Sequence, residues 1–235
     1  MNEVIRLKYM RSFAPFYLLL IGAVLVLVQW GNRTVTVMSE SAPLTDRHCM
    51  IIDAGHGGVD GGATSCTGVL ESQINLQIAL RLDDLCHLLG MDTKMIRTTD
   101  ISVYTEGQTI SQKKMSDLKH RVNIVNDTPN ATLISIHQNY FTDGRYSGAQ
   151  VFYSKGDPSR QLAENMQQNF TITSSTRSAK PSQGVYLMEH IRCRGVLVEC
   201  GFLSNPQEEA KLRSDDYQKL LCCIIASTLS VMGNA

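Results

Sequence analysis

The sequence predicts an α/β fold: a single open, twisted, mostly parallel sheet with helices on both faces, preceded by an N-terminal membrane helix. Short apolar runs alternate along the chain with segments of helical periodicity, which is typical of parallel strands joined by crossover helices. These runs show no apolar–polar alternation, as expected for strands that are buried on both faces. The membrane helix is predicted from a long uncharged segment near the N-terminus.

Residues 1–30 are interpreted as a signal-anchor or transmembrane segment. The run from Phe13 to Trp30 contains eighteen residues and no charge, and a helix of that length spans about 27 Å, close to the hydrocarbon thickness of a bilayer. Basic residues precede the run, so the N-terminus is predicted to face the cytoplasm and the rest to be exported. A cleaved signal peptide has a similar charge pattern, but no clear small-x-small cleavage site follows Val28, which favours an uncleaved anchor.

The remainder divides into a polar tether, residues 31–47, and one domain, residues 48–235, which is long enough for a sizeable core. The 22 basic and 22 acidic residues balance, so the composition has no electrostatic footprint of nucleic-acid binding. The 7 cysteines are odd in number and include no C-x-x-C pair, which argues against a cysteine zinc site and favours free thiols.

The first elements of the domain form a strand–helix–strand unit, which implies parallel neighbouring strands. The apolar run 49–54 predicts a buried strand. The glycines within 55–62 predict a loop that either bends closely around a ligand or simply turns the chain. Apolar residues at spacings of three and four predict a helix over 71–89, with Gly90 after its end, and residues 91–97 predict the second strand.

The rest of the domain is predicted to contain further elements of both kinds. Residues 98–115 are polar and irregular. Periodicity and turn residues predict helices over 116–125, 162–170, from Asn205 and over 216–232, strands over 131–136, 148–153 and 196–198, and an exposed loop over 171–184.

Two histidines, His56 and His137, stand at the ends of two apolar runs. A third run ends in Glu199, and Glu71 opens the first predicted helix. Because the carboxyl ends of the strands in an open α/β sheet converge on one crevice, these side chains are expected to lie together. Three metal-type ligands and a spare carboxylate are what a hydrolytic zinc site requires.

Residue type alone leaves a structural role open for each of these side chains. A histidine after a strand is more often hydrogen-bonded than bound to metal, and Glu71 suits a helix N-terminus without any metal. Backbone donors could satisfy Glu199 if it is buried. Asp53, Ser135 and Asn139 flank the same positions, where they either orient ligands or make ordinary strand-end hydrogen bonds.

Other catalytic classes have little support in the sequence. No G-x-S-x-G nucleophile elbow occurs, and the glycine spacing within 57–62 fits neither a Walker nor a dinucleotide motif. Cys200 stands beside Glu199, but no histidine partner for a thiol nucleophile is evident from the spacing.

Six stretches carry a family resemblance, and they are IIDAGHGGVDGGA, GVLESQINLQIALRL, MIRTTD, RVNIVN, LISIHQN and VLVECGFLSNPQEEAKL. In this order they resemble the zinc-dependent N-acetylmuramoyl-L-alanine amidases of type 3. The resemblance implies that His56, Glu71 and His137 bind Zn²⁺ and that Glu199 is the catalytic carboxylate. It also implies the substrate, which is the amide bond between N-acetylmuramic acid and L-alanine of the peptidoglycan stem peptide.

The stretches VDGGATSCTGVLES, DISVY and QKKMSDLKHRVNIVN are most similar to the germination-specific, spore-cortex amidases of endospore-forming bacteria. Those enzymes remove stem peptides so that muramic-δ-lactam can form. The resemblance implies an exported protein on the outer face of the membrane, in the forespore envelope, either anchored or released after signal cleavage. The long polar stretch 101–115 departs from the broader family.

Three hypotheses accompany this interpretation. A site built from loops is expected to need a partner that orders it, and the anchored single-domain layout suggests a sporulation-specific lipoprotein. A membrane-anchored, non-catalytic peptidoglycan-binding or scaffold protein on the same fold is one alternative function. A zinc peptidase that cuts within stem peptides is the other.

Overall fold

The computed structural model describes residues 48–232. The predicted membrane segment and the tether, residues 1–47, lie outside the described residues, so the structure does not test them. Within residues 48–232, no helix is both long enough and apolar enough to cross a membrane.

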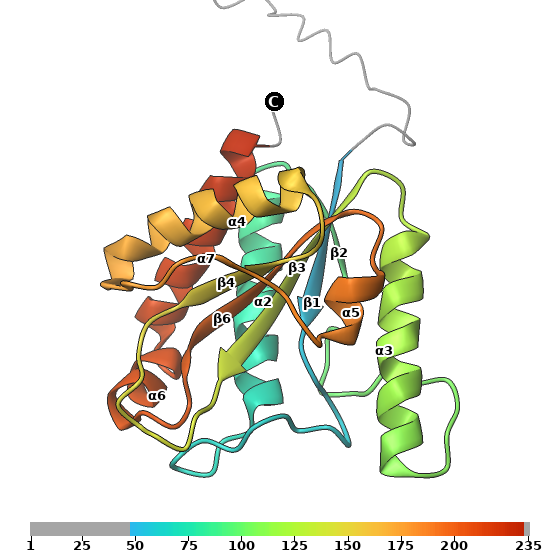
Figure 1. The fold of residues 1–235 in the computed structure, drawn as a ribbon, viewed down its shortest axis with the longest axis horizontal. Coiled ribbons are helices and arrows are strands. Elements are labelled where there is room, and N and C mark those ends of the chain that lie inside the picture. The colour runs from blue at the N-terminus through green and yellow to red at the C-terminus, as the bar shows by residue number, and fades with distance from the viewer. Residues whose placement is uncertain (1–47, 233–235) are drawn as a thin grey trace, which may run out of the picture. The chain divides into compact units, whose positions relative to one another are not determined.

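Six strands in the described part of the chain form one sheet with the order β2-β1-β3-β6-β4-β5 (Figure 1). The strands are β1 (Cys49–Ala54), β2 (Asp92–Met95), β3 (Ala131–Asn139), β4 (Gln150–Tyr153), β5 (Lys180–Pro181) and β6 (Arg194–Phe202). Strand β1 pairs in parallel with β2 and β3, β3 with β6, and β4 with β5, whereas β4 and β6 are antiparallel. The prediction of a mostly parallel sheet is therefore confirmed.

Helices cover both faces of the sheet, as predicted. The helices are α2 (Glu71–Leu88), α3 (Ile110–Asn126), α4 (Asp157–Asn169), α5 (Tyr186–His190), α6 (Pro206–Leu212) and α7 (Asp215–Met232), with a 3-10 turn η1 (Phe170–Thr173) after α4. Successive strand residues point to opposite faces. Ile52 accordingly packs in a core with residues of α2, α4 and α7, and Ile51 packs in a second core with residues of α3 and α5.

Helix α3 begins at Ile110, six residues before the predicted start at Ser116. Thr109 caps it reciprocally: its Oγ1 accepts from the backbone N–H of Gln112 at 3.2 Å, and Oε1 of Gln112 accepts from the N–H of Thr109 at 3.1 Å. Hydrophobic periodicity does not find this start because Ile110 is 71% exposed. The Thr-x-x-Gln spacing is the local signal that marks it.

Strands β3 and β6 extend past their predicted ends at residues 136 and 198. They pair in parallel, with His137 opposite Glu199. Both residues therefore lie within strands, and the prediction that His137 follows its strand is wrong. The prediction ended each strand at its last apolar residue, but the backbone pairing continues through the polar residues His137 and Glu199. Helix α5 is also unpredicted, because its five residues are too few to show a helical period.

Candidate metal centre

His56 lies in the loop that follows β1, and its backbone is left-handed with a φ of 60°. For a residue with a side chain this conformation costs roughly 1–2 kcal/mol, so the surrounding structure must hold it. Its Nδ1 lies 2.9 Å from Oδ2 of Asp60, and its Nε2 lies 3.3 Å from Oε2 of Glu71. Nε2 is therefore the nitrogen that faces the candidate site.

Glu71 is the first residue of α2, where a carboxylate is favoured by the unpaired N–H groups of a helix start. It is buried, with 4% of its surface exposed. Its Oε1 accepts from the backbone N–H of Gln138 at 3.1 Å and from Nδ2 of Asn75 at 3.2 Å. Its Oε2 accepts from the N–H of Ala63 at 3.0 Å. These donors hold the carboxylate in one orientation.

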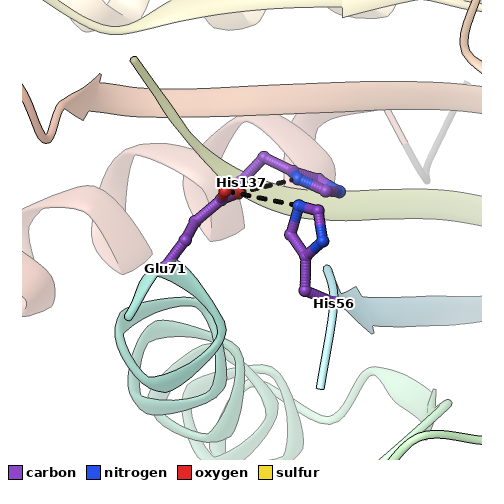
Figure 2. A group of neighbouring side chains, drawn as sticks. All are labelled: His56, Glu71 and His137. Carbon is purple, nitrogen blue, oxygen red and sulfur yellow. Dashed lines mark hydrogen bonds and ion pairs between the residues drawn. The ribbon is translucent and has the colours of Figure 1, made fainter. Parts of the chain in front are cut away.

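His137 reaches the same carboxylate from strand β3. Its Nδ1 lies 3.0 Å from Oε1 of Glu71, and its ring centroid lies 5.0 Å from that of His56. Figure 2 shows Glu71 at the start of its helix with both imidazole rings facing its carboxylate. One possible ligand atom from each of the three residues lies within 4.8 Å of the others. The structure thus brings together the three side chains that were predicted as ligands.

Gly55 leaves the space that the His137 ring occupies. A Cβ at this position would lie 2.3 Å from both Cε1 and Nε2 of His137. Gly55→Ala is therefore expected to displace His137 and to weaken zinc binding by about tenfold or more. Zinc per chain, measured after dialysis against a weak chelator, checks this. Gly61→Ala is the control in the same loop, because the atoms nearest to its Cβ would be those at the flexible end of Leu70. Equal zinc retention by both variants would contradict the prediction.

The charges around the site suit a cation. Burial alone would lower the pKa of His56, but hydrogen bonds to Asp60 and Glu71 outweigh it and raise the pKa to about 9. Burial would likewise raise the pKa of Glu71, but hydrogen bonds from His137 and His56 hold it well below its ordinary value. The lowered pKa keeps the Glu71 carboxylate ionised, so it presents a negative charge that a cation can balance.

Glu199 is the fourth predicted residue, and it lies beside His137 on strand β6. The residue is partly buried, and its Oε2 is a buried atom without a hydrogen-bond partner among the described residues. Burial raises the pKa of Glu199 to about 7, with the charge of Glu71 adding to burial and the two imidazoles opposing it. A carboxylate with one buried, unpartnered oxygen and a pKa near neutrality is suited to proton transfer.

The three flanking residues have different surroundings. Oγ of Ser135 donates to Oδ2 of Asp53 at 2.7 Å, and Asp53 also pairs with the guanidinium of Arg121. Arg121 in turn donates to the backbone carbonyl of His56 at 2.8 Å. Asp53 and Ser135 are therefore connected, through Arg121, to the backbone of the loop that carries His56. The backbone carbonyl of Asn139 accepts from the N–H of Leu203 at 2.9 Å, which is an ordinary strand-end contact.

The buried pair of Asp53 and Arg121 makes a prediction about stability. Burial would raise the pKa of Asp53, but Arg121, His137 and Ser135 hold it below its ordinary value of 3.8. The ionised Asp53 carboxylate therefore stabilises the fold fully at pH values above 3.8, its ordinary pKa. This stabilisation is lost as the pH falls through the lower pKa that Asp53 has in the folded state. Asp53→Asn is expected to lower the free energy of unfolding by about 3–5 kcal/mol near neutral pH.

Denaturant titrations of the parent and Asp53→Asn, under neutral and strongly acidic conditions, check this. The difference between the two proteins should narrow in acid, because the Asp53 carboxylate is protonated there. A difference that stays constant or grows on acidification would contradict the assignment.

Asp60 is a functional candidate that the sequence reasoning missed. It accepts from His56 through Nδ1 and lies 3.2 Å from Nζ of Lys114. Metal-binding histidines usually donate their other ring nitrogen to a carboxylate or carbonyl, which fixes the ring. The available signal was a carboxylate four residues after a histidine in a glycine-rich loop.

A cleft of about 210 Å³ opens beside the two histidines. Lys114, Asp117 and Leu118 of helix α3 line one part of it, and Val185 and Tyr186 near helix α5 line another. The histidine side chains therefore contact a space that could receive part of a substrate.

Comparisons with known proteins show the family to which the chain belongs. Residues 50–230 match the family model described as N-acetylmuramoyl-L-alanine amidase. The germination-specific N-acetylmuramoyl-L-alanine amidase of Bacillus subtilis is 36% identical over 182 residues, which are 76% of this chain and 76% of that protein. The chain belongs to the N-acetylmuramoyl-L-alanine amidase family.

Solved structures show the same fold. The CwlD amidase of Clostridioides difficile, in complex with the GerS lipoprotein, is 34% identical with a TM-score of 0.76, covering 79% of this chain and 98% of that one. An N-acetylmuramoyl-L-alanine amidase from Clostridium difficile 630 is 28% identical with a TM-score of 0.68, covering 79% of this chain and 96% of that one.

Proposed function

We propose that this chain is a zinc-dependent hydrolase of the amide bond between N-acetylmuramic acid and L-alanine of the stem peptide. The observation that carries the proposal is the convergence of His56, Glu71 and His137, with Glu199 on the neighbouring strand. Family membership supplies the substrate class. The roles of the four residues are part of the proposal.

The donor set fits zinc. Two imidazole nitrogens and one carboxylate oxygen are a common three-ligand set for catalytic zinc, and they leave a further position for water or substrate. Asp60 would hold the His56 ring, and the donors around Glu71 would hold its carboxylate. A bound zinc ion would lower the pKa of a water molecule to about 7 and polarise the scissile carbonyl.

Glu199 would move the proton in this reaction. Its carboxylate would accept a proton from the attacking water as the bond from the water oxygen to the lactyl carbonyl carbon forms. It would then give that proton to the alanine nitrogen as the carbon–nitrogen bond breaks. The products are a lactyl carboxylic acid on the sugar and a stem peptide with a free amino terminus. A pKa of about 7 lets one carboxylate perform both transfers.

The biological setting is proposed from the relatives. One relative is named a germination-specific amidase, and another is bound to the GerS lipoprotein in its structure. We therefore place the activity in spore-cortex muramic-δ-lactam formation, outside the membrane in a spore former, with an activating lipoprotein as partner. The predicted N-terminal segment would anchor the enzyme there or serve as its signal.

Product analysis tests the proposed reaction. The full chain is stripped of metal with a chelator, restored with zinc, and incubated with purified peptidoglycan, and the products are identified by mass spectrometry. The expected products are complete stem peptides that begin with free L-alanine and glycan that carries unsubstituted lactyl groups. Shortened peptides would indicate a peptidase instead. Unchanged peptidoglycan that binds the protein would indicate a scaffold.

A further inference from the structure

Arg97 is a buried arginine whose guanidinium is bound almost entirely by backbone carbonyls. It follows strand β2, and 2% of its surface is exposed. Its Nε donates to the carbonyl of Ala54 at 2.8 Å, and its Nη1 donates to that of Thr99 at 3.0 Å. Its Nη2 donates to the carbonyls of Gly55 at 3.0 Å and Ser72 at 2.9 Å. One planar group therefore fixes four backbone positions at once.

Two of these carbonyls belong to neighbours of candidate metal ligands. Gly55 directly precedes His56, and Ser72 directly follows Glu71. His56 comes from the loop after β1, whereas Glu71 begins α2, so the two ligands are carried by different elements. Arg97 donates to both backbones through the same nitrogen, Nη2. It is therefore placed to set the distance between the two ligands.

The hydrogen bonds of Arg97 help to hold the left-handed backbone at His56. His56 is left-handed, and Arg121 donates to the carbonyls of Ala54 at 3.0 Å and His56 at 2.8 Å. Together with Arg97, this accounts for the carbonyls of three consecutive residues, 54–56. Unfavourable backbone conformations persist only where the surroundings determine them, and they gather at functional sites.

Gly57 leaves room for Arg97 against this loop. A Cβ there would lie 2.9 Å from Nε of Arg97 and 2.4 Å from the carbonyl oxygen of Ile101. The nearest carboxylate is that of Asp100, 4.0 Å from Nη1 and 45% exposed, and the charges of Asp53 and Asp117 also favour the ionised guanidinium. All the hydrogen bonds given for the guanidinium go to backbone carbonyls, so its contacts fix the backbone, which favours a positioning role over a packing role.

We propose that Arg97 is a positioning residue that holds His56 and Glu71 at metal-binding separation. The proposal rests on the zinc site of the proposed function. A lysine would keep the charge, but its single Nζ cannot reproduce the planar set of donors to four carbonyls. Arg97→Lys is therefore expected to weaken zinc binding by about 10- to 100-fold, and Arg97→Met by more.

The test compares zinc affinity with fold stability in the full chain. The zinc dissociation constant is measured by competition with a chromogenic chelator, and the unfolding midpoint is measured in excess chelator. Leu82→Ala is the stability control, because Leu82 is a fully buried residue of α2 that packs in the core. Arg81→Met is the charge control, since Arg81 pairs with Asp215 and Gln218 on helix α7. Arg97→Lys, which keeps the charge, is the variant that decides if Arg97→Met does not fold.

The proposal expects Arg97→Lys to lose zinc affinity, whereas Leu82→Ala loses stability and keeps its affinity. The cobalt-substituted Arg97→Lys protein should also show an altered visible absorption spectrum. Unchanged zinc affinity in Arg97→Lys, or a loss no larger than that of Leu82→Ala, would overturn the positioning role alone. A parent protein that binds no zinc would overturn the proposed function together with it.

Discussion

Glu199→Gln is expected to reduce peptidoglycan hydrolysis by about 10²- to 10⁴-fold while the zinc content stays at the parent level. Glutamine has nearly the shape of glutamate, but it cannot accept a proton from water at neutral pH. Glu199 lies on β6 opposite His137 and has one buried oxygen without a partner among the described residues. The fold should therefore tolerate the change, and the loss should fall on the proton transfers. Initial rates of amide cleavage and zinc per chain are measured together.

Glu164→Gln is the matched control for this variant. Glu164 lies on helix α4, and its side chain is 55% exposed and faces Arg160. It should keep parent activity. Near-normal hydrolysis by Glu199→Gln with zinc bound would remove Glu199 from the mechanism. Loss of zinc from Glu199→Gln would instead make it a ligand, which contradicts its assignment as the proton carrier.

His56→Ala and His137→Ala are each expected to lose zinc and, with it, activity. The binding free energy of structural zinc sites, about 10–16 kcal/mol over four ligands, suggests a loss on the order of 10²- to 10³-fold in affinity for each ligand. The loss should be visible as zinc per chain at limiting free zinc. Excess zinc should restore part of the binding but little activity, because a two-ligand site orients the metal poorly.

His87→Ala is the control for the histidine variants, since His87 lies on the same helix as Glu71 and its side chain is 59% exposed. Its ring contacts Asp83 and Thr93, and it should retain zinc. Full zinc occupancy in either His56→Ala or His137→Ala would contradict the ligand assignment of that residue.

The main outline of the fold could be predicted from the sequence because its signals are local. Apolar runs predicted the strands at 49–54 and 131–136, and spacings of three and four predicted α2 to within one residue of its end. The ends of β3 and β6 could not be predicted, since His137 and Glu199 are polar residues that extend the pairing into the site. The antiparallel pairing of β4 with β6 is set by the order of strands, which no local pattern records.

The candidate site could be predicted only in part, because some of its residues carry no signal in the local sequence. The convergence of His56 and His137 could be expected from the rule that strand ends meet, whereas the ligand roles of the two histidines and Glu71 were implied by the family resemblance. The structure brings the three side chains together. Asp60 needed knowledge of the loop conformation that turns it towards His56. Arg97 stands in the matching stretch MIRTTD, but its role could not be predicted because its partners are backbone carbonyls, which any residue provides.

Hydrolysis in ¹⁸O-labelled water tests the central claim most directly. The zinc-restored full chain is incubated with peptidoglycan in labelled water, and the released peptide and the glycan are analysed by mass spectrometry. Attack of water on the lactyl carbonyl predicts one ¹⁸O atom in the muramic carboxylate and none in a stem peptide with a free L-alanine terminus. Label in a carboxylate of the stem peptide, with the muramic amide intact, would contradict the account.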